Sequence, residues 1–516
     1  MNIMEAKEQI EQSVSTYLRK DEFGQYKIPI ERQRPVFLLG PPGIGKTAIM
    51  EQIAQSLDIA LVSYSMTHHT RQSALGLPFI NHKVYGKQEF DVSEYTMSEI
   101  VASVYETMEK TGKQEGILFL DEINCVSETL APSMLQFLQY KTFGNHQIPS
   151  GWIVATAGNP PQFNRSVREF DVVTLDRLRV LEVEADYDTW RKYAVNKGLH
   201  SAILTYLDVK KSDFYQIENT VDGKSYVTAR GWEDLSETLY LYEEQEFEVG
   251  ETLIGQFLRN KKIAREFAAY YDLYRKYKQD YQVHQILDGE AGKVVLERAK
   301  KAGFDERLSL MGLLMDALQE SIREHVRRES ALRFLTLTLR EVKGDLVFAE
   351  TKTAEYIEEI LTAKADAIQD KMIKEDAANA LGSLDRYTYL QAENTLRRYQ
   401  RQIKIEGTTE PKEAFEYLRT QFELAVSELK RHVELITQKL DHLFEFVEKA
   451  FGNGNEMLIL VTDLTINYAS AKFISEYGCK KYFKYNKKFQ IHERQMEIAN
   501  ELDHLDLTQL ALDEEA

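Results

Sequence analysis

The chain has 516 residues, of which 43% are hydrophobic and 28% are charged. This composition excludes a disordered or fibrous chain, and the length suits about three domains of roughly 150 residues each. The 64 Lys and Arg residues against 82 Asp and Glu residues give a net charge of −18. Such an acidic chain would be repelled by nucleic acids and anionic membranes, so we expect neither as a partner except through a local basic patch.

The sequence also bears on the cellular location. The two cysteines, Cys125 and Cys479, exclude a disulfide framework and a cysteine-based zinc site. Residues 1–20 carry mixed charges and lack the apolar core of a secretory signal. No apolar run approaches the roughly 20 residues that a membrane helix needs. We therefore expect a cytoplasmic protein with no membrane insertion.

The first third of the chain alternates short apolar runs with amphipathic stretches. The amphipathic stretches predict helices, for example at residues 47–57 and 129–140. Buried strands separated by helices are typical of a parallel sheet in an α/β domain. The apolar runs predict these strands at residues 36–39, 59–64, 117–120, 152–157 and 180–183.

The rest of the chain is predicted to be helical. Nine of the ten prolines lie in the first 161 residues, and the remainder is rich in residues that favour helices. Helices are expected at 187–197, 201–207 and 229–244, and longer ones follow. Between residues 422 and 447 the apolar residues are spaced by alternating steps of four and three, which indicates a coiled-coil-like seam. We expect this seam within the chain, in a hairpin or bundle; a seam with another subunit is the alternative.

The strongest motif follows the first predicted strand. It satisfies the pattern GxxxxGK[ST] between a strand and a helix, and its residues are Gly40, Pro41, Pro42, Gly43, Ile44, Gly45, Lys46 and Thr47. Glycines let backbone N–H groups surround phosphate oxygens, and the following helix adds its positive end. Lys46 would reach the β- and γ-phosphates, and the Thr47 hydroxyl would bind Mg²⁺. The motif therefore predicts a nucleoside triphosphate site.

A second motif follows a later strand. The segment 116–120 is followed by two adjacent carboxylates, Asp121 and Glu122, at the strand end where ligands of open α/β sheets bind. Asp121 would hold the magnesium ion, directly or through water, and Glu122 would polarise the water that attacks the γ-phosphate. The next predicted strand leads to Asn159, which would position that water or contact the γ-phosphate. An Asn before a Pro is by itself only a turn signal.

Together these motifs resemble those of AAA+ ATPases, and in detail those of the MoxR-type and dynein-related branch. The matching segments are Asp121-Glu-Ile-Asn124, Ala155-Thr-Ala-Gly-Asn159-Pro160 and Leu175-Asp-Arg177-Leu178, within a resemblance that covers about residues 30–240. The resemblance implies that Asn159 is sensor 1 and that Arg177 is an arginine finger for a neighbouring subunit, with Arg179 as the competing candidate. It also implies that Arg230 is sensor 2 at the start of a lid helix, although Ala229 stands where the family usually has Pro.

The resemblance further implies a fold and a mode of action. It implies an α/β P-loop NTPase sandwich with a parallel sheet, which we assign to residues 1–185, and a helical lid, which we assign to 186–285. The helix-favouring composition of the rest predicts a long all-α C-terminal domain at 286–516. The protein would be an ATPase that uses ATP and Mg²⁺ in a homo-oligomeric ring, for which the family implies a hexamer. It would act as a chaperone or remodeller of a protein client. Relatives are commonly paired with a von Willebrand factor A-type protein.

Three other functions fit parts of the sequence. A nucleic-acid-directed AAA+ motor of a defence or restriction system would use the basic and aromatic run at 480–489, where tyrosines could stack on bases and lysines neutralise phosphates. We favour a different interpretation of that run, a helix with a solvated lysine face and a buried aromatic face that docks on acidic neighbours such as 513–515. A small-molecule P-loop kinase, or a nucleotide-gated scaffold without hydrolysis, would leave Glu122 without a role.

The segment 66–112 is longer than a simple connection needs. It contains a predicted hairpin near residues 81–86, and in relatives this region carries a pore-facing insertion that handles the client. His68 and His69 are adjacent within it, but no Cys or HxxxH partner accompanies them, so we do not expect a metal site there.

Overall fold

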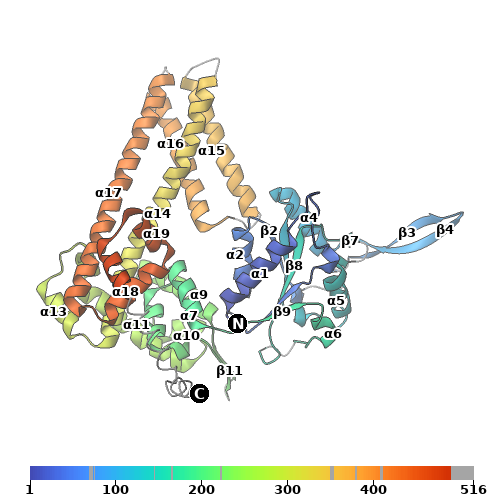
Figure 1. Cartoon of the computed structure of the whole chain (residues 1–516), viewed down its shortest axis with the longest axis horizontal. Coiled ribbons are helices and arrows are strands. Elements are labelled where there is room, and N and C mark those ends of the chain that lie inside the picture. Colours follow the sequence, from blue (N-terminus) through green and yellow to red (C-terminus); the bar gives the residue numbers. More distant parts are fainter. Residues whose placement is uncertain are drawn as a thin grey trace, which may run out of the picture.

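The structure is a computed structural model of the chain. It describes residues 1–68, 72, 74, 76–143, 146–163, 167–220, 223–348, 354–377, 381–406 and 411–489. A domain built on a parallel sheet is followed by an extensive helical region, in which the described residues include one small hairpin (Figure 1). This arrangement confirms the predicted fold class.

The core sheet has five parallel strands in the order β2-β5-β8-β1-β9. Short apolar runs of this kind form strands because helices can cover both faces of a parallel sheet. Since all five strands run in one direction, their carboxyl ends meet at the same edge. The strands confirm the predicted ones and are β1 Val36–Leu39, β2 Ala60–Ser65, β5 Gly116–Asp121, β8 Trp152–Gly158 and β9 Arg179–Glu182.

Helices cover both faces of this sheet. Two of them, α1 and α2, pack on one face together with strand residues such as Leu38, whereas α4 and α5 pack on the other face with residues such as Phe37. Successive strand residues thus enter two different hydrophobic cores, as the two-residue period of a strand requires. The four helices are α1 Ile3–Tyr17, α2 Lys46–Ser56, α4 Glu99–Thr111 and α5 Ala131–Tyr140.

A long hairpin projects away from the sheet (Figure 1). Its strands, β3 Pro78–Tyr85 and β4 Gln88–Tyr95, pair in antiparallel register and confirm the hairpin predicted near residues 81–86. Apolar side chains such as Ile80 and Val84 are exposed along it. The shorter elements of the sheet domain are η1 Ile30–Arg32, η2 Met66–His68, η3 Ile123–Cys125, β6 Thr142–Phe143, β7 His146–Gln147 and α6 Val172–Leu175.

The next part of the chain would form the lid. Its helices α7 and α9 match the predicted bounds, because each has a capping side chain at its start: Asp186 accepts from Thr189 N–H and Thr228 accepts from Gly231 N–H. The sequence did not predict the hairpin β10–β11. The elements are α7 Tyr187–Lys197, α8 Ser201–Val209, η4 Lys211–Asp213, β10 Gln216–Thr220, β11 Gly223–Val227, α9 Ala229–Glu244, α10 Glu251–Phe257, α11 Lys261–Tyr281, α12 Val283–Leu287 and α13 Lys293–Lys301.

Long helices form most of the remaining chain. The stripe predicted at 422–447 lies in α17, and its residues Ile436, Leu440 and Val447 are buried in the same hydrophobic cluster as lid residues. The seam is therefore within the chain, as predicted. The domain boundaries at 185 and 285 stay predictions. The helices are α14 Phe304–Phe348, α15 Ala354–Ala377, α16 Ser383–Glu406, α17 Pro411–Phe451, α18 Asn455–Ile466 and α19 Tyr468–Tyr477.

Upper parts of α14 and α17 form a four-helix arm with α15 and α16 (Figure 1). Leu335, Ile357, Leu396 and Leu418, one from each helix, belong to its separate hydrophobic core. The arm begins where α14 packs on α8 and α11, and α15 in turn contacts α4 of the sheet domain. Helices of the arm thus contact both the sheet domain, through α4, and helices α8 and α11.

Helix α7 is tied to the C-terminal helices by buried polar contacts. Arg191 donates to Asp208 at 2.6 and 2.9 Å and to Asp463 of α18 at 2.8 Å. The Asn467 amide, between α18 and α19, donates to the Val195 carbonyl at 3.1 Å. These contacts fix one face of α7 on α18 and α19.

The basic and aromatic run at 480–489 is helical and packs against α17. Tyr482 and Tyr485 are buried, and Lys481 pairs with Glu445 at 2.8 Å. This confirms the predicted packed helix, although its acidic neighbours lie on α17. Phe483 on the same helix is 51% exposed. The acidic segment 513–515 that was expected to receive it lies outside the described residues.

Among the described residues, no single helix is long and apolar enough to cross a membrane. Helices α18 and α19, which are bent by 90° at their junction, pass the same length and composition test as a pair. Both contribute buried residues, such as Leu460 and Ile474, to the cluster that contains the lid.

Candidate functional site

The predicted site residues gather at the carboxyl edge of the sheet. The P-loop follows β1, Asp121 and Glu122 end β5, and Asn159 follows β8. These three strands are neighbours in the order β5-β8-β1, so residues more than a hundred positions apart meet at one place. This is the edge at which open parallel sheets bind ligands.

Glycines are required at three positions of the P-loop. Gly43 and Gly45 have φ angles of 74° and 93°, in the left-handed region that side chains disfavour. A Cβ on Gly40 would lie 2.8 Å from the Val183 carbonyl oxygen, so only glycine fits beside the end of β9. Helix α2 begins at Lys46, directly after the loop, and points its positive end towards the loop.

Lys46 is held inside this loop. Its Nζ atom donates to the carbonyl oxygens of Gly40 and Pro41 at 2.8 Å each and to Asn159 Oδ1 at 2.9 Å. The side chain is only 8% exposed. Burial lowers the pKa of Lys46 to about 8, against the opposing charge of Asp121. A phosphate group would supply the anionic partner that this ammonium lacks.

Thr47 and Asp121 form a candidate magnesium site. The Thr47 hydroxyl donates to Asp121 Oδ2 at 3.0 Å, which brings a hydroxyl and a carboxylate oxygen together beside the P-loop. Mg²⁺ prefers such oxygen ligands and is usually held by one or two carboxylates together with water and phosphate oxygens. Thr47 and Asp121 suit such a site, in which water and phosphate oxygens would supply the remaining ligands. No group of three or more His, Cys, Asp or Glu side chains suited to a metal occurs among the described residues.

Glu122 is fixed by neighbours that the sequence did not identify. Its backbone lies in the left-handed region at φ 54°, and its N–H donates to Asp121 Oδ1 at 2.8 Å. Its carboxylate accepts from the Ser65 hydroxyl at 3.2 Å and from the Thr67 hydroxyl at 3.1 Å. Ser65 pairs with Asp121 in the register of β2 and β5. The available signal was the pair of hydroxyl residues at the end of the adjacent strand.

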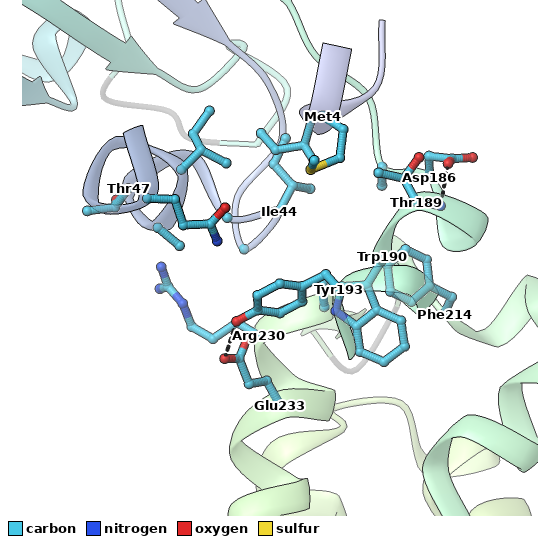
Figure 2. Close-up of a pocket in the computed structure, with 18 of the residues that line it drawn as sticks. Met4, Ile44, Thr47, Asp186, Thr189, Trp190, Tyr193, Phe214, Arg230 and Glu233 are labelled. Atoms are coloured by element: carbon cyan, nitrogen blue, oxygen red, sulfur yellow. Dashed lines mark hydrogen bonds between the residues drawn. The ribbon is translucent and has the colours of Figure 1, made fainter. Parts of the chain in front are cut away.

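Arg230 reaches the site from the lid. Its backbone N–H donates to the Gly43 carbonyl at 3.2 Å, and Thr228 lies against Gly43. The side chain is exposed and extends from α9 towards the P-loop (Figure 2). Its charge contributes to the low pKa of Lys46, after burial. Tyr215 adds a second link, since its hydroxyl donates to the Pro42 carbonyl at 2.8 Å. Helix α9 and Tyr215 therefore contact the P-loop directly.

A cavity of about 350 Å³ lies between the P-loop and the lid. Figure 2 shows Met4 and Ile44 on one side and the rings of Trp190 and Tyr193 on the other. The lining is mainly apolar and aromatic, which suits the flat face of a nucleobase. Of these residues, only Ile44 belongs to a sequence motif, because Met4 comes from α1 and Trp190 and Tyr193 come from α7.

The two arginine-finger candidates differ in their surroundings. Arg179 lies on β9 and its guanidinium donates to the Ser13 hydroxyl of α1. Arg177 is exposed, and no side-chain hydrogen bond or ion pair is seen for it among the described residues. Its charge adds to the hydrogen bonds from Thr174 that lower the pKa of the nearby Asp171. Beside Arg177, Val172 and Val173 of α6 are 81% and 60% exposed. Among the described residues, Arg179 is thus engaged within the chain, whereas the Arg177 side chain is exposed.

Two other sequence features lie near the site. His68 ends η2, and its expected neighbour His69 lies outside the described residues. Cys125 ends η3, two residues after Ile123, and burial raises the pKa of its thiol. A raised thiol pKa gives no support to a nucleophilic role for Cys125.

Comparisons with known proteins agree with this geometry. Residues 36–174 match the family model described as "ATPase family associated with various cellular activities (AAA)". Among solved structures, a RuvB mutant from Thermotoga maritima is similar at 13% identity and a TM-score of 0.24, covering 38% of this chain and 51% of that one. The match spans about half the length of that structure and is too weak to carry an argument. No curated protein matches the chain.

Proposed function

We propose, from the premise that residues 36–174 form an AAA ATPase family domain, that the protein binds ATP with Mg²⁺ and hydrolyses it to ADP and phosphate. The observation that carries this proposal is the convergence of Lys46, Thr47, Asp121, Glu122 and Asn159 at one edge of the sheet. Each has the chemistry that phosphoryl transfer to water requires, and the cavity beside the P-loop has room for a base.

The roles of the residues follow from their positions. Backbone N–H groups of the P-loop and the Lys46 ammonium would bind the phosphates, while Thr47 and Asp121 would hold Mg²⁺, which neutralises part of the phosphate charge. Glu122 would take a proton from the attacking water, since its carboxylate is aimed by the Ser65 and Thr67 hydroxyls.

The experiment compares binding with turnover in purified protein. We expect Glu122→Gln to retain ATP binding and to lose roughly 10²–10⁴-fold in phosphate release, the usual contribution of a general base. Lys46→Ala should lose nucleotide binding itself. Fluorescent-nucleotide titration and a phosphate-release assay with and without Mg²⁺ separate the two variants. Normal hydrolysis by Glu122→Gln would refute the assignment of the base.

We further propose that the protein works as a homo-oligomeric ring of the MoxR type, with a hexamer as the form that the resemblance implies. The exposed Arg177 and its apolar neighbours support this, because an arginine supplied by an adjacent copy would complete each site. Opening and closing of such an interface with hydrolysis would give a mechanical cycle.

The client of this cycle would be a protein, for which the MoxR resemblance suggests a von Willebrand factor A-type partner. The buried tyrosines of the 480–489 helix and the net charge of −18 give a nucleic-acid client no support. Glu122→Gln held in ATP should capture the partner in a pull-down from the native host. Repeated recovery of nucleic acid without protein would contradict this proposal.

A further inference from the structure

Asn124 lies between two loops of the site without a role in the proposed chemistry. It is in η3, directly after the Asp121-Glu122 pair, and is 3% exposed. Its side-chain Nδ2 donates to the main-chain oxygen of Asn159 at 2.9 Å. Its own main-chain oxygen accepts from the Arg168 N–H at 2.9 Å. One residue thus connects the loop that follows β5 with the loop that follows β8.

The orientation of the Asn124 amide is fixed by its surroundings. If the amide were turned over, Oδ1 would face the Asn159 carbonyl oxygen, and two acceptors would meet. As it stands, Oδ1 is buried and has no hydrogen-bond partner among the described residues. A buried acceptor without a partner costs stability, so packing alone does not explain an amide here.

Gly158 makes room for this amide. A Cβ at Gly158 would lie 2.5 Å from Asn124 Oδ1 and 2.9 Å from Nδ2, which is closer than side chains approach. A side chain at position 158 would therefore displace the Asn124 amide. The bond from Asn124 fixes the Asn159 peptide, and the Asn159 side chain in turn accepts from Lys46 at 2.9 Å.

We propose that Asn124 is a positioning residue for hydrolysis: it holds the Asn159 main chain so that the Asn159 amide faces Lys46 and the γ-phosphate. The inference rests on the proposed ATPase activity and deepens it. Among the described residues, the side-chain hydrogen bond of Asn124 goes to the Asn159 carbonyl, so we expect Asn124 to act through Asn159. Its loss therefore lowers the rate of the chemical step and leaves nucleotide affinity nearly unchanged.

The first test separates the rate from affinity. We expect Asn124→Ala to lower kcat about tenfold or more, with ATP affinity within about threefold of the unsubstituted protein. Gln33→Ala is the matched control, since the buried Gln33 amide also donates to a main-chain carbonyl, that of Ile28 at 3.0 Å, but at the other end of β1. It should lower stability and leave kcat unchanged. Equal losses of kcat in both variants would overturn the proposal.

The second test asks whether Asn124 acts through Asn159. In an Asn159→Ala background the aligned side chain is absent, so adding Asn124→Ala should cause little further loss of kcat. Two residues that act as a unit give such non-additive effects. Losses that multiply in the double variant would show independent roles and would refute the inference.

The third test uses the isosteric Asn124→Asp. A protonated carboxyl can donate to the Asn159 carbonyl, whereas a carboxylate cannot. The activity of this variant relative to the unsubstituted protein should therefore fall as pH rises, while the relative activity of Asn124→Ala should stay flat. A flat profile for both would contradict a donor role. If the unsubstituted protein shows no ATP turnover, the proposed function fails; if it turns over ATP and Asn124→Ala does too at an equal rate, only this inference fails.

Discussion

Lys46 and Arg177 are both cationic residues that we propose act on ATP, yet their surroundings within the chain differ. Lys46 is buried and makes three hydrogen bonds, and Asp121, Glu122 and Asn159 around it are each held by a neighbour. Arg177 is exposed beside exposed valines. The residues that we propose for phosphate binding and water activation are thus held in place by contacts within one chain. The charge that we assign to the transition state would come from another copy.

The strongest loss of ATP turnover is expected from a substitution of Arg177. Arg177→Ala should lower ATP turnover per subunit by about 10³–10⁵, the usual contribution of an arginine finger, because the substituted chain cannot complete its neighbour's site. Turnover per subunit of the unsubstituted protein should rise steeply with protein concentration, and the variant should lack this rise. A phosphate-release assay over a wide concentration range measures both.

Arg179→Ala is the matched control, since it removes a guanidinium two residues away that already contacts Ser13. We expect it to change turnover little. If Arg179→Ala rather than Arg177→Ala abolished activity, the assignment would pass to Arg179. Activity that is independent of concentration and unchanged in Arg177→Ala would contradict an interface site altogether.

Arg191 differs from Arg177, because its loss should lower the stability of the fold rather than affect assembly. Arg191→Met removes the cation between Asp208 and Asp463 and leaves two partly buried carboxylates without it. Breaking such a buried pair typically costs about 3–5 kcal/mol of unfolding free energy. Burial raises the pKa of Asp463 and Arg191 opposes this rise, so the variant should be relatively less destabilised at acidic pH.

Urea unfolding of Arg191→Met, Arg177→Ala and Lys110→Met measures the difference. Lys110 makes an exposed pair with Glu106 on α4, for which about 0.5 kcal/mol or less is expected. Arg177→Ala should be as stable as the unsubstituted protein, in spite of its lost activity. A large stability loss in Arg177→Ala would mean that its side chain supports the fold rather than an interface.

The spacing of residues along the sequence predicted most of the candidate site that lies within one chain. The remaining contacts depend on how distant strands pair. The P-loop glycines, the strand ending in Asp121 and the cap of α9 are all specified by adjacent residues, so the sequence revealed them. The hydroxyls of Ser65 and Thr67 became partners of Glu122 only through the pairing of β2 with β5. No spacing within the chain encodes that register.

The same limit applies to the two arginines and to the base cavity. Arg177 and Arg179 are both arginines and lie two residues apart, so their sequence positions do not distinguish them. Only the packing of α1 beside β9 gives Arg179 a partner, Ser13. Trp190 and Tyr193 line the cavity because the lid docks on the P-loop through Tyr215 and Thr228. Contacts between distant elements therefore decide which arginine is engaged within the chain and which residues line the cavity.

The smallest expected effect concerns the charge of Lys46. Burial lowers its pKa from 10.5 to about 8, so above pH 8 the empty site loses the ammonium that phosphates require. ATP affinity should therefore fall by about tenfold for each pH unit above 8. The stability of the protein without nucleotide should change with pH in the opposite direction. The unfolded chain binds more protons than the folded chain between pH 8 and 10.5, so stability should rise with pH across that window.

Lys46→Arg tests whether this pH dependence belongs to Lys46. An arginine stays charged throughout this range, so the variant should bind ATP more weakly at pH 7 but with a nearly flat profile up to pH 10. Fluorescent-nucleotide titration gives the affinity, and urea unfolding without nucleotide gives the stability. An identical decline above pH 8 in both proteins would assign the titration to another group.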